Sequence, residues 1–518
     1  MLRLLAACTA VVGLAAYVAR RRIARRLINT IPGPAPSSWL FGNLVDLFIT
    51  HEYGDNEFKW QEAYGPVYAI QGCFGETRLM LSDPTAIKFV LNSPAFVSGA
   101  SQQKAANALF GYGSVFMAQG NHHKYLRGLM NPWFSAKNVR STLPIMREIA
   151  VKLVERWEQL GFPGKTVDVT RSMGDAAIDI VGDAIFEHPF NNLATDNGLS
   201  KTQRALVNSM SSASRTAILT DFILKFIPDF IFSLAVTLPL PATQMLRDYH
   251  AETDHLGRNL VSQKRATMVP GAKRDEAFVS ALLTTEENPS LGVPDDQVAV
   301  HLRTILFAGE DTTGSTLGWL LYKLAELQDY QGALREEINQ AAPDDYDNMP
   351  LLNAIINEVL RFYPALPMAE RTAAADCILP LSQPITTTSG TQITHIPIHK
   401  GQYVYVAIGS YHRLDSVWGA DAAQFKPERW LQKEPACRSA ALGPYASLLS
   451  FLAGHGVCLG WRFAVQEIQV LIVEIIRNFV LTLPPNDTVR AQCFGLTLVP
   501  KTADDVQHIP IHVEHVHN

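Results

Sequence analysis

The spacing of hydrophobic and polar residues predicts a mainly helical chain with few strands. Short apolar runs at 67–71 and 77–81 predict the two strands of a hairpin. No repeat, low-complexity run or flexible linker interrupts residues 40–518, which indicates one large helical domain. Apolar residues that recur every three or four positions predict half-buried helices at 84–91, 146–160, 173–186, 244–263 and 329–341.

The longest helical pattern runs without an internal proline from 294 to about 327. At 1.5 Å per residue such a helix is about 50 Å long, enough to cross a domain. Its midpoint, residues 308–313, reads Ala-Gly-Glu-Asp-Thr-Thr. Gly309 weakens the helix there and leaves room for a ligand, and the Thr312 hydroxyl can bond to the carbonyl of Ala308 and bend the helix. We therefore expect a grooved midpoint.

The amino terminus has a different pattern. Residues 4–19 carry no charge, and five arginines follow within 20–26. A helix of that length rises about 24 Å, slightly less than a hydrocarbon core of about 30 Å, and arginine stems can cover the difference. We expect a membrane anchor in 1–20, a basic and proline-rich linker in 21–39, and the folded domain in 40–518. A cleaved signal peptide is the alternative, which Tyr17 disfavours because it would be the third residue before a cleavage site that follows Ala19.

One cysteine lies in a glycine-rich loop near the carboxyl end, in the ten residues 451–460 with the sequence Phe-Leu-Ala-Gly-His-Gly-Val-Cys-Leu-Gly. The following stretch to about 479 has helical spacing, so Cys458 precedes a helix. The helix dipole and free N–H groups there favour a thiolate, the form that ligates iron. Glycines around it let the backbone approach a flat cofactor. A small buried core cysteine is the alternative interpretation.

Four segments together resemble the cytochrome P-450 family. The cysteine loop resembles its haem-binding signature, Phe-x-x-Gly-x-Arg-x-Cys-x-Gly, and 308–313 resembles its oxygen-activating helix. Residues 358–361 match its Glu-x-x-Arg pair, and 427–430, Pro-Glu-Arg-Trp, match its Pro-Glu-Arg-Phe segment. The order and spacing are the family's. The resemblance covers nearly the whole chain and implies the cytochrome P-450 fold, a large mainly α domain with small β-sheets, here with an N-terminal transmembrane helix. It also implies haem b, with Cys458 as the axial iron ligand.

The resemblance further implies which side chains hold the haem propionates. These are His123 and Arg127, one turn apart on a predicted helix, and Arg371. The chain departs from the family at Gly456, where the signature has an arginine that contacts a propionate. His455 could reach the same carboxylate, or the other cations could hold it. Haem affinity is the property that this departure affects.

Two further groups take their roles from the resemblance. Cleavage of dioxygen needs two protons, which the Thr312 hydroxyl would pass on and Asp311 would supply through water, while the thiolate pushes electron density to the iron. Glu358 and Arg361 share one face of the helix predicted for 350–362, which Pro364 ends, and can pair. With Arg429 they would form a buried network of structural rather than catalytic importance.

The expected substrate pocket is apolar, although each of its residues could instead belong to the core. Such a pocket indicates a hydrophobic substrate oriented by few polar contacts. The chain looks like fungal secondary-metabolism members of the family, so a terpenoid, fatty or aromatic metabolite is expected. The apolar segment 218–240 contains charges and prolines, which exclude a membrane span, and resembles the family's membrane-dipping access region. The expected lining residues are Phe110, Tyr112, Phe116, Phe307, Ala308, Leu366, Met368 and Leu498.

Composition and charge narrow the range of partners. The chain has 518 residues, 47% of them hydrophobic, and six scattered cysteines whose spacing suggests no disulfide framework or zinc site. Its net charge is −5, of which the first 30 residues contribute +6 through six arginines, so the remainder carries −11. An acidic body disfavours nucleic acid as a partner, and the basic cluster is expected to meet anionic lipids.

The resulting hypothesis is a haem-thiolate monooxygenase in the endoplasmic reticulum membrane, single-pass, with the catalytic domain facing the cytosol. The sequence contains no flavin or nicotinamide motif. We therefore expect electrons from a separate NADPH-cytochrome P-450 reductase, with cytochrome b5 as a further donor, docking near Lys124, Lys137 and Arg140. The alternatives are a haem-thiolate isomerase or dehydratase, which needs no external electrons, and a non-enzymatic haem-binding membrane protein.

Overall fold

The computed structural model describes residues 28–195, 198–210, 214–238, 240–267, 277–283, 292–432, 442–485, 488–494 and 497–516. The predicted membrane anchor in 1–20 and the first part of the predicted linker lie outside these ranges. Within them, no helix has both the length and the apolar composition that crossing a membrane requires.

Helices form most of the described chain. The helices in the first half are α2 (Leu44–Phe48), α3 (Glu57–Tyr64), α4 (Pro84–Asn92), α5 (Ala100–Phe110), α6 (Gly120–Met130), α7 (Ala136–Ser141), α8 (Leu143–Gln159), α9 (Thr170–Val181), α10 (Gly198–Met210), α11 (Arg215–Leu224), α12 (Asp229–Val236) and α13 (Pro241–Thr267). Those in the second half are α14 (Phe278–Leu282), α15 (Asp295–Glu326), α16 (Gln328–Gln340), α17 (Pro350–Phe362), α18 (Ile408–Tyr411), α19 (Asp415–Trp418) and α20 (Trp461–Asn478).

The strands form four small sheets. The largest has five strands in the order β1 (Val67–Gln71), β2 (Thr77–Leu81), β8 (Tyr403–Ala407), β5 (Met368–Ala373) and β3 (Phe96–Val97). A three-stranded sheet has β12 (Pro510–His515) in the middle, between β4 (Lys165–Asp168) and β9 (Phe479–Thr482). The remaining two are antiparallel pairs, β6 (Cys377–Thr386) with β7 (Gln392–Ile398) and β10 (Arg490–Phe494) with β11 (Thr497–Lys501).

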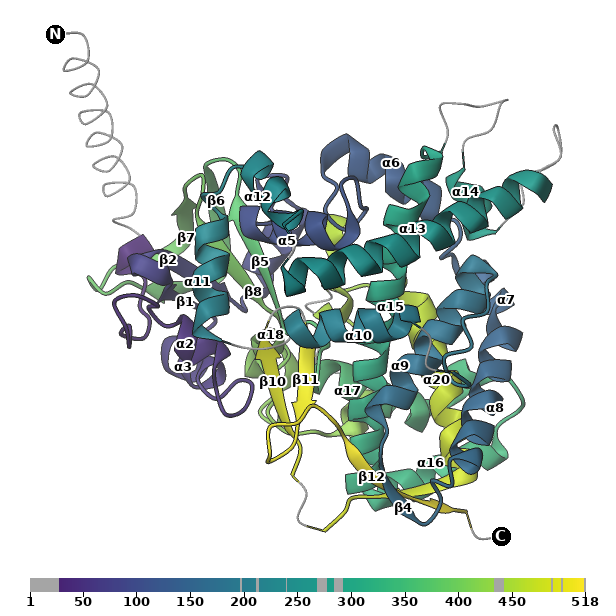
Figure 1. Ribbon diagram of the computed structural model, residues 1–518. Coiled ribbons are helices and arrows are strands. Elements are labelled where there is room, and N and C mark those ends of the chain that lie inside the picture. The colour runs from purple at the N-terminus through teal and green to yellow at the C-terminus, as the bar shows by residue number, and fades with distance from the viewer. Residues whose placement is uncertain are drawn as a thin grey trace.

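Figure 1 shows the five-stranded sheet on one side of the molecule, most helices on the other, and α15 between them. The mainly helical fold with small sheets is the predicted one. The predicted hairpin is present, with β1 antiparallel to β2 and Val67 opposite Leu81. Each helix predicted from periodicity is also present, with ends that differ by a few residues, and the long helix extends over Asp295–Glu326.

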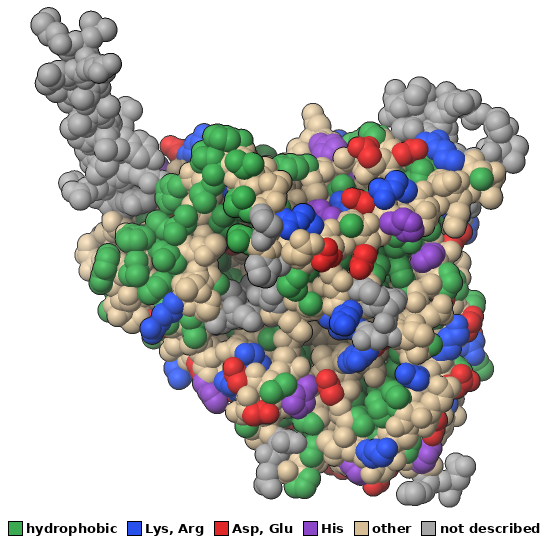
Figure 2. Space-filling view, viewed as in Figure 1, with side chains coloured by type: hydrophobic (Ala, Val, Ile, Leu, Met, Phe, Trp, Pro, Cys, Tyr) green, Lys and Arg blue, Asp and Glu red, His purple; other side chains and the backbone are tan. Residues whose placement is uncertain are grey.

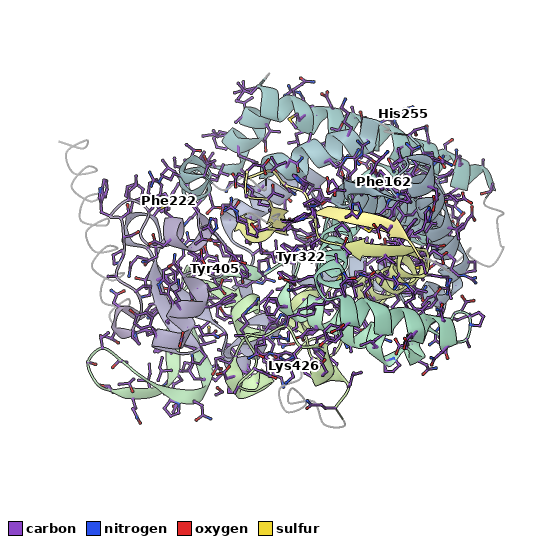
Figure 3. The ribbon with its side chains drawn as sticks, turned by 90° about the horizontal axis from the view of Figure 1, so that it is seen from below. Phe162, Phe222, His255, Tyr322, Tyr405 and Lys426 are labelled. Carbon is purple, nitrogen blue, oxygen red and sulfur yellow. The ribbon has the colours of Figure 1, made fainter. Side chains whose placement is uncertain are left out.

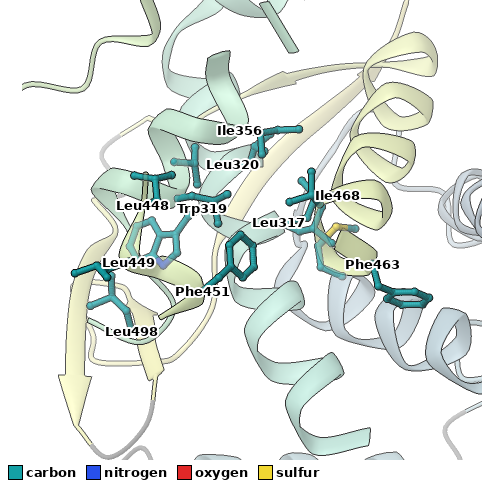
Figure 4. Close-up of a cluster of buried hydrophobic side chains, with 14 of the residues drawn as sticks. Leu317, Trp319, Leu320, Ile356, Leu448, Leu449, Phe451, Phe463, Ile468 and Leu498 are labelled. Carbon is teal, nitrogen blue, oxygen red and sulfur yellow. The ribbon is translucent and has the colours of Figure 1, made fainter. Parts of the chain in front are cut away.

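The main core lies where α15, α17, α20 and the segment before the cysteine loop meet. Figure 4 shows Leu317 and Trp319 of α15, Ile356 of α17 and Ile468 of α20 packed with Phe451. All of them are buried. Burial of such side chains contributes about 1.5–3 kcal/mol each, so this cluster fixes the loop relative to the long helix.

The proline-rich segment after residue 30 packs on the body of the protein. Ile28 and Ile31 are buried in the main core, and the Ala69 amide donates to the carbonyl of Pro32. A Cβ at Gly33 would lie 1.8 Å from the carbonyl oxygen of Ala69. Only glycine allows so close an approach, so residues 28–33 are part of the folded domain rather than a free linker.

The segment 218–240 forms α11 and α12, which expose an unusual number of large apolar side chains. None of the residues of α12 is buried. Figure 2 shows hydrophobic side chains gathered over this part of the surface. Phe222 of α11, labelled in Figure 3, packs on Phe74 with ring centroids 5.0 Å apart, and Lys225 binds Glu76 at 2.6 Å. The most exposed apolar residues here are Ile223, Phe226, Phe230, Ile231, Leu234, Leu238 and Leu240.

Candidate active site

The midpoint of α15 has an accessible face although most of the helix is buried. Ala308 is exposed, whereas Phe307 and Leu306 next to it are buried. Because α15 runs through the protein, this exposed turn faces interior space rather than the outer surface. The Thr312 hydroxyl donates to the carbonyl of Ala308 at 2.6 Å, which is the predicted contact. The structure therefore has an accessible turn at the predicted position on the helix.

Asp311 lies on this accessible turn of α15. Burial raises the pKa of its carboxyl to about 6, and a hydrogen bond with the Thr497 side chain opposes that rise. A carboxyl with this pKa exchanges a proton near neutral pH, as a proton donor must. The geometry thus fits the role that the family resemblance implies for Asp311.

Glu310 is a second buried carboxyl, and it was not singled out from the sequence. It is 5% exposed, and its Oε2 accepts a 2.5 Å hydrogen bond from the side chain of Gln203. Burial raises its pKa to about 8, although Arg204 opposes that rise. Gln203 also accepts a hydrogen bond from the Tyr249 hydroxyl at 2.8 Å. The Gln203 amide therefore links α10, α13 and α15 next to the accessible turn.

Cys458 lies three residues before the start of α20, as predicted. Its backbone N–H donates to the carbonyl of Phe451 at 2.8 Å, which closes the loop. The side chain is accessible, yet burial is the main cause that raises the pKa of its thiol. The two observations agree if the sulfur lines an internal cavity. A hydrogen bond from Gly460 and the charge of Arg127 lower the pKa, but in the protein alone they do not outweigh burial, contrary to the predicted preference for a thiolate.

Four predicted cationic or titratable side chains surround the cysteine loop. Arg127 of α6 donates to the carbonyl of Val457 at 3.0 Å. Burial and the nearby charges of Arg127 and His455 lower the pKa of His123, so these three lie close together. Arg371 of β5 lies near Gly456, since a Cβ there would be 3.6 Å from its Nη2. Within the described residues neither arginine has a carboxylate at ion-pair distance, although burial lowers the pKa of both. Such a site favours a ligand with carboxylates.

The predicted network behind the loop is present. Glu358 and Arg361 of α17 make two hydrogen bonds, of 2.9 and 2.7 Å, and both side chains are fully buried. Arg429 donates to the same carboxylate at 3.1 Å. Sequence reasoning missed two members, Trp430, whose indole N–H donates to Glu358 at 2.9 Å, and Asp421, which pairs with Arg429 at 2.9 Å.

Six of the predicted pocket residues, all but Ala308 and Leu498, divide into three groups. Phe110 and Phe307 are buried against each other with ring centroids 5.4 Å apart, and Phe116 is 49% exposed beside Phe110. Leu366 and Met368 are half-buried. Tyr112 is 59% exposed, and its hydroxyl lies 3.0 Å from that of Ser233.

Leu498 does not line the pocket. It has no exposed surface and belongs to the main core, where Figure 4 shows it beside Leu449. Successive strand residues face opposite sides, so in β11 Thr497 reaches Asp311 while Leu498 faces the core. The prediction for Leu498 was wrong because β11 is buried along this stretch, where Thr497 and Val499 on either side are buried too.

A family model for cytochrome P-450 matches residues 32–505. The chain belongs to the cytochrome P-450 family. It is 30% identical to cytochrome P-450 monooxygenase 91 of Postia placenta, with 97% of each chain covered. It is 29% identical to monooxygenase 219 of the same fungus, with 89% of each covered, and 28% identical to monooxygenase claW of Ampulloclitocybe clavipes, with 90% and 89% covered. This cytochrome P-450 is a monooxygenase that uses haem b.

The residues around Cys458 fit haem b. The cofactor is flat, needs a sulfur ligand on one side, and carries two carboxylates. The cytochrome P-450 offers an accessible sulfur in a loop with little side-chain bulk, and two half-buried guanidinium groups that have no carboxylate at ion-pair distance within the described residues. Each guanidinium can form a charge-assisted hydrogen bond to a propionate.

Proposed function

We propose that this enzyme is a membrane-attached haem-thiolate monooxygenase in which Cys458 binds the haem iron and Arg127, Arg371, His123 and His455 surround the propionates. The substrate is a hydrophobic small molecule such as a terpenoid secondary metabolite, and a separate NADPH-dependent reductase supplies the electrons. The observation that carries the proposal is the accessible Cys458 sulfur, with two arginines beside it that make no ion pair within the described residues.

The bound haem supplies dioxygen activation, favoured by electron density from the thiolate. Asp311 supplies protons, since its pKa of about 6 lets it exchange them near neutral pH. The Thr312 hydroxyl donates to the carbonyl of Ala308, which leaves its oxygen free to accept a hydrogen bond from water. A proton can therefore pass from Asp311 through water to Thr312 at the accessible turn of α15.

The substrate class follows from the pocket walls. Phe116 presents aromatic surface with the buried Phe110 and Phe307 rings packed behind it, and the half-buried Leu366 and Met368 add aliphatic surface. Such walls orient a ligand by shape and burial rather than by many hydrogen bonds. The relatives are proteins of fungi, which supports a fungal secondary metabolite.

Two surfaces support the proposed location and partner. The apolar side chains of α11 and α12 form an exposed surface that suits the apolar part of a lipid layer. Trp39, which is 80% exposed, adjoins it through Phe74. Lys124 and Lys137 are exposed near the cysteine loop, and Arg140 is paired with Asp347 at 2.8 Å. We propose that the first surface rests on the endoplasmic reticulum membrane and that the lysines meet an acidic reductase.

A spectral experiment tests the axial ligand. Ferrous protein with carbon monoxide is expected to show the red-shifted Soret band of a thiolate haem, and Cys458→Ser is expected to abolish it. Cys377→Ser, at a half-buried cysteine of β6, is the matched control and is expected to keep the band. A normal band in Cys458→Ser would reject the assignment.

A second experiment tests the reaction class. Fungal metabolite extracts are incubated with the holoenzyme, NADPH and a cytochrome P-450 reductase, and products are searched for by mass. A gain of one oxygen atom that requires the reductase is expected. Turnover of a peroxide substrate without reductase would instead support the isomerase or dehydratase alternative.

A further inference from the structure

The carboxyl end of α5 is held by side chains from two other helices. Arg303 of α15 donates through Nε to the carbonyl of Phe110 at 3.0 Å, and Nε2 of His250 on α13 lies 2.9 Å from the carbonyl of Leu109. The last carbonyls of a helix lack partners within the helix and form the negative end of its dipole. The Arg303 guanidinium and the His250 imidazole therefore fix the backbone at Leu109 and Phe110.

Arg303 is itself held in one position. It is 4% exposed, and its Nη1 donates to Asp254 at 2.5 Å and to the Thr253 hydroxyl at 3.2 Å. A Cβ at Gly111 would lie 3.1 Å from its Nη2, so the chain passes directly over the guanidinium. A planar group with several donors can satisfy all these contacts at once, which an ammonium cannot.

The loop after α5, residues 111–119, lies over the reactive face of α15. The Ser114 and Thr304 hydroxyls are 2.8 Å apart. Thr304, Ala308 and Thr312 are spaced by four, so they share one face of the helix. The loop is therefore attached one turn before the accessible residue Ala308, on the same stripe.

The anchored backbone determines where the aromatic side chains stand. The Phe110 ring meets Phe307 edge to face at 5.4 Å and Phe116 at 5.5 Å, with interplanar angles of 78° and 72°. Phe307 follows Arg303 by four residues, so the side chains of Arg303 and Phe307 lie on one side of α15.

We propose that Arg303 is a specificity-determining positioning residue, which sets the aromatic wall formed by the accessible Phe116 ring and the buried Phe110 and Phe307 rings behind it, and so favours substrates that carry a ring or a similarly flat apolar group. The inference rests on the proposed function of this site. Arg303 touches no substrate, and it acts through the backbone at Phe110.

Two iron ligands that differ by one ring test the proposal in ferric holoenzyme. Imidazole and 4-phenylimidazole are titrated, and their Kd values are read from the shift of the Soret band. Arg303→Met is expected to raise the Kd of 4-phenylimidazole about three- to tenfold and to leave the Kd of imidazole within about twofold. A three- to tenfold change corresponds to the free energy of one or two aromatic contacts. Arg265→Met, which breaks an exposed ion pair with Asp295 at the start of α15, is the control and is expected to change neither.

The effect must pass through the aromatic wall. Phe110→Leu is expected to reproduce the loss of 4-phenylimidazole affinity, and the double variant to be no weaker than either single variant, because coupled residues are not additive. Arg303→Lys keeps the charge but not the fork of donors, so it is expected to behave like Arg303→Met. It also provides the comparison if Arg303→Met takes up no haem.

Three results would overturn the inference. These are an unchanged ratio of the two Kd values in the Arg303 variants, equal weakening of both ligands, and strict additivity with Phe110→Leu. The thiolate Soret band of the ferrous carbon monoxide form is measured in the same samples. Its absence in the wild-type enzyme rejects the proposed function, whereas a normal band with an unchanged ratio rejects only the role of Arg303.

Discussion

Replacement of Arg371 by leucine is expected to weaken haem retention. The Nη1 of Arg371 donates to the backbone carbonyl of Glu370 at 2.8 Å, and within the described residues this cation has no ion pair. Burial lowers its pKa, so the site disfavours the charge unless an anion joins it. A haem propionate is that anion in the proposed complex. Arg371→Leu removes the cation that pairs with the propionate. It also removes an unfavourable, half-buried charge from the apoprotein.

The size of the effect follows from one charge-assisted hydrogen bond. Such a bond contributes about 1.5–3 kcal/mol, and each 1.4 kcal/mol is a factor of about ten. Haem loss from Arg371→Leu is therefore expected to be about 10- to 150-fold faster than from the wild type. The thermal stability of the apoprotein is expected to be unchanged or slightly higher, because Arg371 makes no ion pair within the described residues.

Transfer of haem to excess apomyoglobin, followed by absorbance, measures the rate. Gly456→Ala is the matched control, since its Cβ would make an ordinary contact of 3.6 Å with Arg371, and its rate is expected to stay within about twofold of the wild type. Gly456→Arg, which restores the family residue, places a second cation beside Arg371 and is not expected to slow haem loss. Equal rates for Arg371→Leu and wild type would refute the reasoning and leave the propionates to Arg127 and His123.

Three more variants test other parts of the structure. Arg361→Met removes one of the two arginines that pair with the buried Glu358 and leaves only Arg429 there, so it is expected to cost about 3–5 kcal/mol in denaturant unfolding, against less than about 1 kcal/mol for Arg140→Met in an exposed ion pair. Because the pKa of Glu310 is raised from 4.5 to about 8, its burial makes the wild type lose stability as the pH rises through that window. Glu310→Gln removes this loss, so its melting temperature relative to wild type should be higher at pH 8 than at pH 5, and a constant difference would contradict the assignment. Thr312→Ala is expected to bind ligand normally but to divert reductant to hydrogen peroxide, whereas Thr316→Ala, one turn along α15, is expected to stay coupled; equal peroxide yields would reject the proton route.

The elements that the sequence predicted well are those with local causes. The strands at 67–71 and 77–81 match the observed bounds, because a short apolar run and a tight turn define them. The helix at 350–362 begins at Pro350 and ends before Pro364, which cannot continue it. The cysteine loop and the Glu358–Arg361 pair could be predicted because their residues are close in the sequence.

The contacts that the sequence did not predict join distant segments. Glu310 was missed because helical spacing does not tell which neighbour, here Gln203 of α10, will meet a polar side chain. Trp430 was known only as a departure in a motif, and its bond to Glu358 depends on how the chain folds back. Leu498 was expected in the pocket, but the packing of β11, which its local sequence does not reveal, buries it in the main core.

The three-stranded sheet has a consequence for the order of events during synthesis. Its middle strand, β12, is made after both outer strands, β4 and β9, and pairs Pro510 with Asp168 and His515 with Phe479. At about 5–20 residues per second, β4 leaves the ribosome roughly 20–70 s before its partner exists. Until then its edge is open to pairing with other chains. The nascent protein therefore depends on residues 510–515 to close this sheet, and the wait for them is a period in which chaperones can act.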